Sequence, residues 1–330
     1  YGIHHLQSHL MRQLIGDAGP RFISLEGMGG IGKTALARAT AEALAEEPGL
    51  AGLIWISARS ERLTPDGIVP EEEAARTLED VVNQLWQKLG MGSAEQIRTA
   101  DKLLQLAPVL ANRRYLIVVD NLETVADSQL LPPQLFPLAG ASRFLVTSRE
   151  SLSTFAFVET YSVPELSSQD SAALVTSEVE RLSQGSVALT GADLERIYAS
   201  VGGVPLALKL IAAQAVVLPV ERCLENLHTV GDRRETLFEY IYRQTWRLLS
   251  DSSRRLLFAL HDTITPDGAG LRWLSQMGMG VGLSPEAFTT ALAELSRYSL
   301  LDISGAADDR HYRLHRLTIT FLQNEFRRKT

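Results

Sequence analysis

Short apolar runs recur through the first half of the chain, and helix-forming stretches separate most of them. Five runs have the length of buried strands: 22–25, 53–56, 115–119, 144–147 and about 157–163. Continuously apolar strands that alternate with helices are typical of a parallel sheet covered on both faces. The pattern therefore predicts an α/β domain in this half.

Local signals refine this prediction. The sequence Thr-Leu-Glu-Asp at 77–80 has the pattern of a capping box, so we expect a helix over 81–89 that Gly90 ends. The segment 58–73 holds Pro65, Gly67 and Pro70 among charged residues. Proline and glycine among charged residues predict a surface loop.

The strand pattern stops after Pro164. N-cap patterns at 167–170 and 190–193 open two helices, the first reaching about residue 182, and Pro205 stands where another begins after Gly202 and Gly203. These signals predict a small helical domain.

A third pattern begins near residue 237. Helices are expected over 237–249, 252–260, 285–298 and 317–326, and short strands over 300–303 and 312–314 around a polar tip at 305–310. Helices followed by a hairpin indicate a winged helix. The predicted domains are therefore 1–163, 164–235 and 236–330.

Composition narrows the class of protein. The 330 residues are 45% hydrophobic and 22% charged, as in ordinary globular proteins of more than one domain. The net charge of −7 argues against a nucleic-acid partner, and no apolar run approaches the ~20 residues that span a membrane. The single Cys223 fits a reducing compartment, so we expect a cytoplasmic protein. The chain begins with Tyr1 rather than Met, and we expect a fragment of a longer protein.

The strongest chemical signal is Gly-Met-Gly-Gly-Ile-Gly-Lys-Thr at 27–34, which fits the pattern G-x-x-x-x-G-K-T between a strand and a helix. Its glycines let backbone N–H groups surround phosphate oxygens, and the helix N-terminus adds partial positive charge. Lys33 can reach the β- and γ-phosphates, and Thr34 can ligate Mg²⁺. The predicted cofactors are ADP or ATP and Mg²⁺. The residues expected to bind nucleotide here are Gly27, Met28, Gly29, Gly30, Ile31, Gly32, Lys33, Thr34 and Ala35.

Polar residues at strand ends complete the expected site. Asp120 follows the apolar run 115–119, at the end of a strand where parallel sheets bind ligands, and is predicted to hold Mg²⁺ together with Thr34. Glu123 could orient an attacking water, or could cap or face solvent. Arg149 follows another strand and could meet the γ-phosphate. The predicted catalytic residues are Lys33, Asp120, Glu123 and Arg149.

These motifs, in this order, resemble the signal-transducing ATPases with numerous domains (STAND), within them the NB-ARC-like branch and its bacterial relatives, so we expect a bacterial origin. The resemblance rests on the glycine loop, Val-Val-Asp-Asn-Leu-Glu at 118–123 and Leu-Val-Thr-Ser-Arg-Glu at 145–150. Gly-Val-Pro-Leu-Ala at 203–207 is similar to the family's Gly-x-Pro-Leu-Ala motif, and Leu-His-Arg-Leu at 314–317 resembles its Met-His-Asp motif. This implies that Pro205 packs against the nucleotide and that His315 contacts the ADP β-phosphate in a closed state.

The resemblance implies a fold and a function together. The fold is an α/β P-loop NTPase with a parallel sheet, followed by a helical and a winged-helix domain. The function is a switch in which ADP holds a closed, inactive monomer, ATP opens it to form homo-oligomers, and slow hydrolysis resets it. Effector and sensor domains in a longer chain would be its partners.

Departures from the family pattern, and other functions, remain open. Gly2 lacks the Arg-Glu that follows it in the family, Asn121 replaces a second acid, which favours slow hydrolysis, and Arg316 replaces Asp in the last motif. One alternative is an AAA-type ATPase that binds DNA through its winged helix, since Arg310, Arg313 and the C-terminal end are basic. Another is a metabolic kinase using the same loop.

Overall fold

A computed structural model gives the fold. It describes residues 2–16, 18–45, 47–58, 61–64, 67–70, 74–93, 97–126, 128–228, 246, 249–261, 268–298, 300–304, 310–314, 318–319 and 322. The chain divides into two compact units, which we describe separately. The sheet unit comprises Ile3–Gly27 and Gly32–Val163, and the helical unit comprises Tyr1–Gly2, Met28–Ile31 and Pro164–Thr330.

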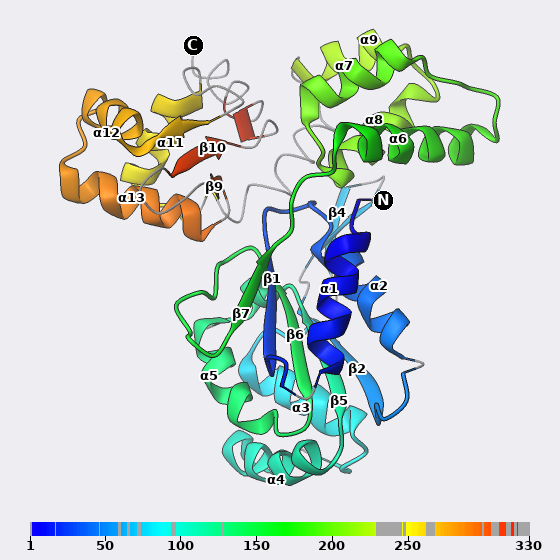
Figure 1. The fold of residues 1–330 in the computed structure, drawn as a ribbon, viewed down its shortest axis with the longest axis vertical. Helices are drawn as coiled ribbons and strands as arrows, with labels where there is room; N and C mark the ends of the chain where they lie inside the picture. Colours follow the sequence, from blue (N-terminus) through cyan, green and yellow to red (C-terminus); the bar gives the residue numbers. More distant parts are fainter. Residues whose placement is uncertain are drawn as a thin grey trace. The chain divides into compact units, whose positions relative to one another are not determined.

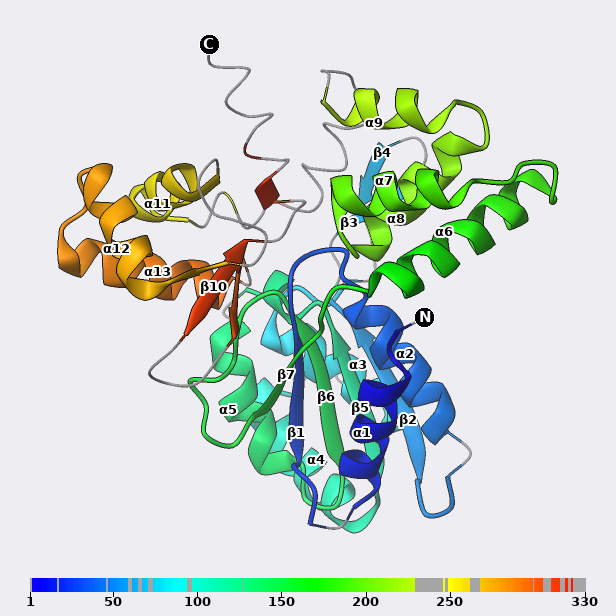
Figure 2. The same ribbon diagram turned by 45° about the horizontal axis from the view of Figure 1, so that its top comes forward.

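Five parallel strands form the centre of the sheet unit, in the order β2-β5-β6-β1-β7 (Figures 1 and 2). Their bounds are β1 Phe22–Glu26, β2 Gly52–Ser57, β5 Tyr115–Asp120, β6 Arg143–Ser148 and β7 Glu159–Ser162. All five predicted strands are confirmed. Because the strands are parallel, their carboxyl ends share one edge of the sheet.

Helices cover both faces of this sheet. On one side lie α1 (His4–Ile15), drawn in front of the strands in Figure 1, and α2 (Lys33–Leu44) next to it. On the other side α3 (Leu78–Lys88), α4 (Thr99–Asn112) and α5 (Leu131–Leu135) enclose a core. The largest side chains of that core include Trp86, Phe22 and Phe144, and the two phenylalanine rings stack with centroids 5.5 Å apart. The predicted capping box is confirmed at α3, where Thr77 and Asp80 bond each other's backbone N–H.

The segment 58–73 differs from the prediction of a surface loop. Here β3 (Glu61–Thr64) and β4 (Gly67–Pro70) pair as an antiparallel hairpin. Ile68 and Val69 are β-branched and favour strands. Proline is tolerated in an edge strand, and both strands of a two-stranded hairpin are edges, so Pro70 can end β4. The loop signal was therefore misleading.

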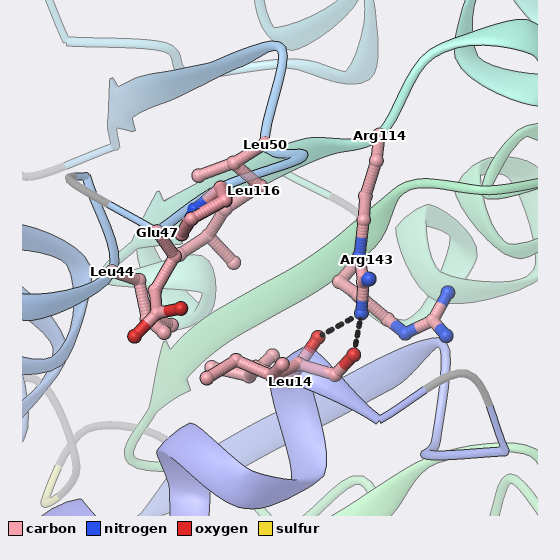
Figure 3. A pocket seen from close by; sticks show the side chains of 9 residues that line it. Leu14, Leu44, Glu47, Leu50, Arg114, Leu116 and Arg143 are labelled. Carbon is pink, nitrogen blue, oxygen red and sulfur yellow. Dashed lines mark hydrogen bonds between the residues drawn. The ribbon is translucent and has the colours of Figure 1, made fainter.

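Two arginines bind the C-terminal end of α1, at the amino ends of β5 and β6 (Figure 3). Arg114 donates hydrogen bonds to the carbonyls of Leu14, at 3.0 Å, and Ile15. Arg143 donates to the carbonyl of Gly16 at 3.1 Å. The last carbonyls of a helix lack partners within it, so these bonds fix α1 to the sheet. The apolar pocket beside them has about 20 Å³ of free space, about one water molecule's worth.

The helical unit begins with four helices, α6 (Ser168–Ser183), α7 (Gly191–Val201), α8 (Pro205–Ala215) and α9 (Val220–His228). The predicted helix starts are confirmed. Ser167 and Thr190 accept hydrogen bonds from backbone N–H groups as N-caps of α6 and α7, and Pro205 is the first residue of α8.

The rest of this unit holds α11 (Asp251–His261), α12 (Leu271–Gly280) and α13 (Pro285–Arg297), with an antiparallel sheet in the order β8-β10-β9. Its strands are β8 Ala269–Gly270, β9 Leu301–Ser304 and β10 His311–Leu314. The predicted elements at 252–260, 285–298, 300–303 and 312–314 are confirmed, whereas α12 and β8 were not predicted. The tip at 305–310 and the helices at 237–249 and 317–326 lie largely outside the described residues. The winged-helix interpretation and the three-domain division stay predictions.

Within the described part of the chain, every helix is too short or too polar to cross a membrane.

Candidate functional site

The glycine loop joins β1 to α2 at the carboxyl edge of the sheet. Gly27, Gly30 and Gly32 have φ values of 146°, 80° and 106°. Residues with side chains rarely adopt such values, so the loop conformation depends on glycine at these positions. Gly32 is the N-cap of α2 and has no side chain to bond the N–H groups of the first turn. A loop and helix N-terminus of this kind suit an anion.

The tip of the loop contacts the first turn of α8, and both segments belong to the helical unit. The Leu206 N–H donates to the Gly30 carbonyl at 3.2 Å. A Cβ on Gly30 would lie only 2.9 Å from the Leu206 Cβ, so glycine permits this approach. Pro205, the neighbour of Leu206, is half-buried. The structure thus brings the loop tip and the Gly-x-Pro motif to adjoining positions.

Lys33 is the first residue of α2, and its side chain is buried. Its Nζ donates to the Gly27 carbonyl at 2.7 Å. Burial lowers the pKa of Lys33 to about 8; the nearby Arg149 lowers it as well, while Glu123 and Asp120 oppose the shift. The ammonium group is therefore poorly solvated, which favours an anionic ligand.

Asp120 lies at the end of β5 and accepts two short hydrogen bonds at one oxygen. Its Oδ1 is 2.7 Å from Thr34 Oγ1 and 2.7 Å from Thr147 Oγ1. Thr147, fully buried near the end of β6, also accepts from the Asn121 N–H at 2.9 Å. Oxygen ligands of this set are those that Mg²⁺ prefers, and the residues present fit such an ion.

The structure pairs Glu123 and Arg149 with each other, although the sequence suggested separate roles. Arg149 Nε lies 3.1 Å from Glu123 Oε1, and the Arg149 backbone N–H donates to Oε2 at 3.2 Å. The side chain of Glu123 is only 4% exposed and that of Arg149 only 9%. Glu123 follows Asn121, whose φ of 63° turns the chain back after β5. This turn, a short 3₁₀ helix at Leu122–Thr124, presents Glu123 to Arg149.

Most residues of this site were predicted from the sequence, and two were not. The structure assembles Lys33, Thr34, Asp120, Glu123 and Arg149 in the sheet unit. It adds Thr147 and Leu206, which belong to the motifs at 145–150 and 203–207 but had been given no role of their own in the site. His315 and Arg316 lie outside the described residues.

Comparisons with known proteins bear on this geometry. A family model described as the NB-ARC domain matches residues 3–183. No curated protein sequence matches the chain. Among solved structures, the Walker-type ATPase of Pyrococcus abyssi is 14% identical, with 97% of this chain and 95% of that one covered and a TM-score of 0.66.

Two further structures resemble the chain less. The Aeropyrum pernix ORC2 protein, solved as ADPNP–ADP complexes, is 15% identical, with 99% and 95% of the two chains covered and a TM-score of 0.52. A STAND protein with a tetratricopeptide repeat sensor from Pyrococcus horikoshii is 13% identical; 98% of this chain but 42% of that one is covered, with a TM-score of 0.40. At these identities, the likeness to the Pyrococcus abyssi and Aeropyrum proteins shows the fold alone.

Proposed function

The chain belongs to the NB-ARC family of P-loop ATPases, and from this we propose that it is a nucleotide-controlled switch. With ADP it is a closed, inactive monomer; ATP opens it and lets copies associate, and slow hydrolysis resets it. The observation that carries this proposal is the bond between the Gly30 carbonyl and the Leu206 N–H. It joins the tip of the phosphate-binding loop to the first turn of α8, so a nucleotide that changes the loop tip would act directly on α8.

Each residue of the site has a proposed role. Backbone N–H groups of 27–35 and the Lys33 ammonium would hold the phosphates, and Thr34 and Asp120 would hold Mg²⁺. When bound, Mg²⁺ neutralises phosphate charge. Arg149 would detect the terminal phosphate. Pro205 and His315 would contact the nucleotide in the closed state, as the family resemblance implies.

The way in which Glu123 is held supports the proposal of slow hydrolysis. Glu123 is the candidate base, and both of its oxygens face Arg149. It must leave this pair before it can accept a proton from water, because a base must reach the proton that it abstracts. Asn121 supplies no second carboxylate beside it. This arrangement favours slow, regulatory hydrolysis over the fast turnover of a metabolic enzyme.

The oligomeric state tests the switch. We expect size-exclusion chromatography with light scattering to give a monomer with ADP and a larger assembly with a non-hydrolysable ATP analogue. Arg149→Gln should bind ADP like the wild type but remain monomeric with the analogue, because only the terminal phosphate would need Arg149. The proposal fails if the mass is the same with both nucleotides, or if calorimetry shows no ADP binding.

One observation favours a second function, an ATPase that binds DNA. Arg310, directly before β10, and Arg313, within it, are both exposed basic side chains. The net charge of −7 opposes this reading. A binding assay with duplex DNA at increasing salt separates the two functions, because DNA binding through phosphate contacts weakens steeply with salt. The switch predicts no such binding.

Nucleotide binding should take up protons near pH 8. Lys33 is about half protonated there in the free protein, since its pKa is about 8, and an adjacent phosphate favours the charged form. Calorimetry of ADP binding in EDTA, in two buffers of different ionisation enthalpy, should show uptake of about half a proton at pH 8 and little at pH 6. In Lys33→Arg, whose side chain stays charged, the uptake should disappear. Equal uptake in both proteins contradicts the assignment.

A further inference from the structure

A buried carboxylate stands directly before the glycine loop and has no part in the roles above. Glu26 is the last residue of β1 and is 8% exposed. Burial raises the pKa of its carboxyl group, and a hydrogen bond from the Leu152 N–H opposes this shift. A negative charge beside a phosphate site repels the ligand, so the position calls for another explanation.

Glu26 contacts both ends of one short segment, residues 148–152, which we call the Arg149 segment. Its backbone pairs at one end, and its side chain accepts a hydrogen bond at the other. In the sheet, Glu26 is the register partner of Ser148, where β6 ends. Beyond that point the chain turns back, and the Leu152 N–H donates to Glu26 Oε1 at 2.7 Å. Arg149 lies between these two attachments, so Glu26 fixes the backbone at Arg149 relative to the end of β1, where the loop begins.

The same residue also meets the chain at the exit of the sheet unit. The Glu26 carbonyl accepts from the Val163 N–H at 2.8 Å, and Val163 is the last residue of the sheet unit. Glu26 is followed directly by Gly27, the first residue of the loop. One residue therefore contacts the Arg149 segment and Val163, and it adjoins the loop.

We propose that Glu26 is a positioning residue that sets Arg149 against the phosphate-binding loop and thereby determines how well the protein distinguishes ATP from ADP. This inference rests on the proposed role of Arg149 as detector of the terminal phosphate. The two nucleotides share every contact except those to the terminal phosphate. Glu26 therefore acts on the ratio of their dissociation constants rather than on affinity in general.

Two substitutions separate position from charge. Glu26→Ala removes the acceptor for the Leu152 N–H, whereas Glu26→Gln keeps an oxygen acceptor and removes only the charge. Glu150→Ala is the matched control, because Glu150 is equally buried beside Arg149 but accepts a hydrogen bond from Gln129, at 2.7 Å. Two quantities are measured: the dissociation constants for ADP and a non-hydrolysable ATP analogue, and amide hydrogen exchange of the Arg149 segment without nucleotide.

In Glu26→Ala the ratio of the two constants should move about tenfold toward one, and exchange at Leu152 should rise about tenfold, as expected for one lost hydrogen bond to a charged acceptor. Glu26→Gln should shift both constants together and keep their ratio and the slow exchange within about twofold. Glu150→Ala should resemble the wild type in both measurements. Slow exchange in Glu26→Ala, or an equal loss of discrimination in Glu150→Ala, overturns the inference. If the wild type itself does not discriminate, the switch fails instead, and exchange at Leu152 alone decides whether Glu26 holds the segment.

Discussion

Lys33→Met is expected to weaken ADP binding by about 100-fold, the effect of removing one desolvated charge from a phosphate site. The same substitution should raise the stability of the nucleotide-free protein. Burial holds the pKa of Lys33 at about 8, below its ordinary 10.5, so the folded protein binds this proton less tightly than the unfolded chain. The resulting destabilisation is fully present below pH 8 and disappears as the pH rises toward 10.5.

At neutral pH this destabilisation is on the order of 3 kcal/mol, and the apolar Met avoids it. Calorimetry measures the affinity, and urea unfolding at pH 7 and pH 10 measures the stability difference. That difference should be large at pH 7 and small at pH 10.

Lys102→Met is the matched control for Lys33→Met. Lys102 is also buried, but its Nζ donates to Asn83 Oδ1, at 2.6 Å, on the side of the sheet where α3 and α4 pack. Its replacement should leave ADP affinity unchanged. If Lys33→Met binds ADP within about threefold of the wild type, the Lys33 ammonium group does not bind the phosphates. If the variant is less stable than the wild type at pH 7, burial of this ammonium group does not destabilise the protein.

The site could be anticipated from the sequence where local signals and sheet topology suffice. The glycine loop is a contiguous pattern, so Lys33 and Thr34 are placed by the chain itself. Asp120 and Arg149 follow apolar runs, and parallel strands bring their carboxyl ends to one edge. No knowledge of side-chain packing was needed to bring these residues near one another.

What the sequence could not give is which polar group bonds to which. The pairing of Glu123 with Arg149 depends on the turn at Asn121, whose positive φ is no more than a minority conformation for asparagine. The role of Glu26 depends on a return of the chain at Leu152, 126 residues away. Contacts of this kind are decided by tertiary structure, and a single sequence carries no record of them.

The hairpin at 61–70 shows a different limit. Pro and Gly are turn signals in most contexts, and they outweighed Ile68 and Val69 in the prediction. In a two-stranded hairpin, half of the backbone groups need no ladder partner, so these residues interrupt little. A rule derived for sheet interiors therefore fails at an isolated edge.

Thr147→Val tests the residue that the sequence analysis missed, and we expect it to lower the free energy of unfolding by about 2–4 kcal/mol. Valine has the shape of threonine, so no cavity forms. The Asn121 N–H loses its acceptor and Asp120 Oδ1 loses one of its two hydroxyl donors. Because Asp120 is also the proposed Mg²⁺ ligand, the gain in ATP affinity that Mg²⁺ gives should fall about tenfold. Urea unfolding and nucleotide titration with and without Mg²⁺ measure the two effects.

Thr40 provides the matched control for this substitution. It is as fully buried as Thr147, on α2, and its hydroxyl has no hydrogen-bond partner among the described residues. Thr40→Val should therefore be neutral or stabilising, since it removes only an unsatisfied polar group, and Thr147→Ser should retain the Mg²⁺ response of the wild type. If Thr147→Val were no more destabilising than Thr40→Val, and its Mg²⁺ response were unchanged, the Thr147 hydroxyl would not be holding Asp120, and the carboxylate would owe its orientation to Thr34 alone.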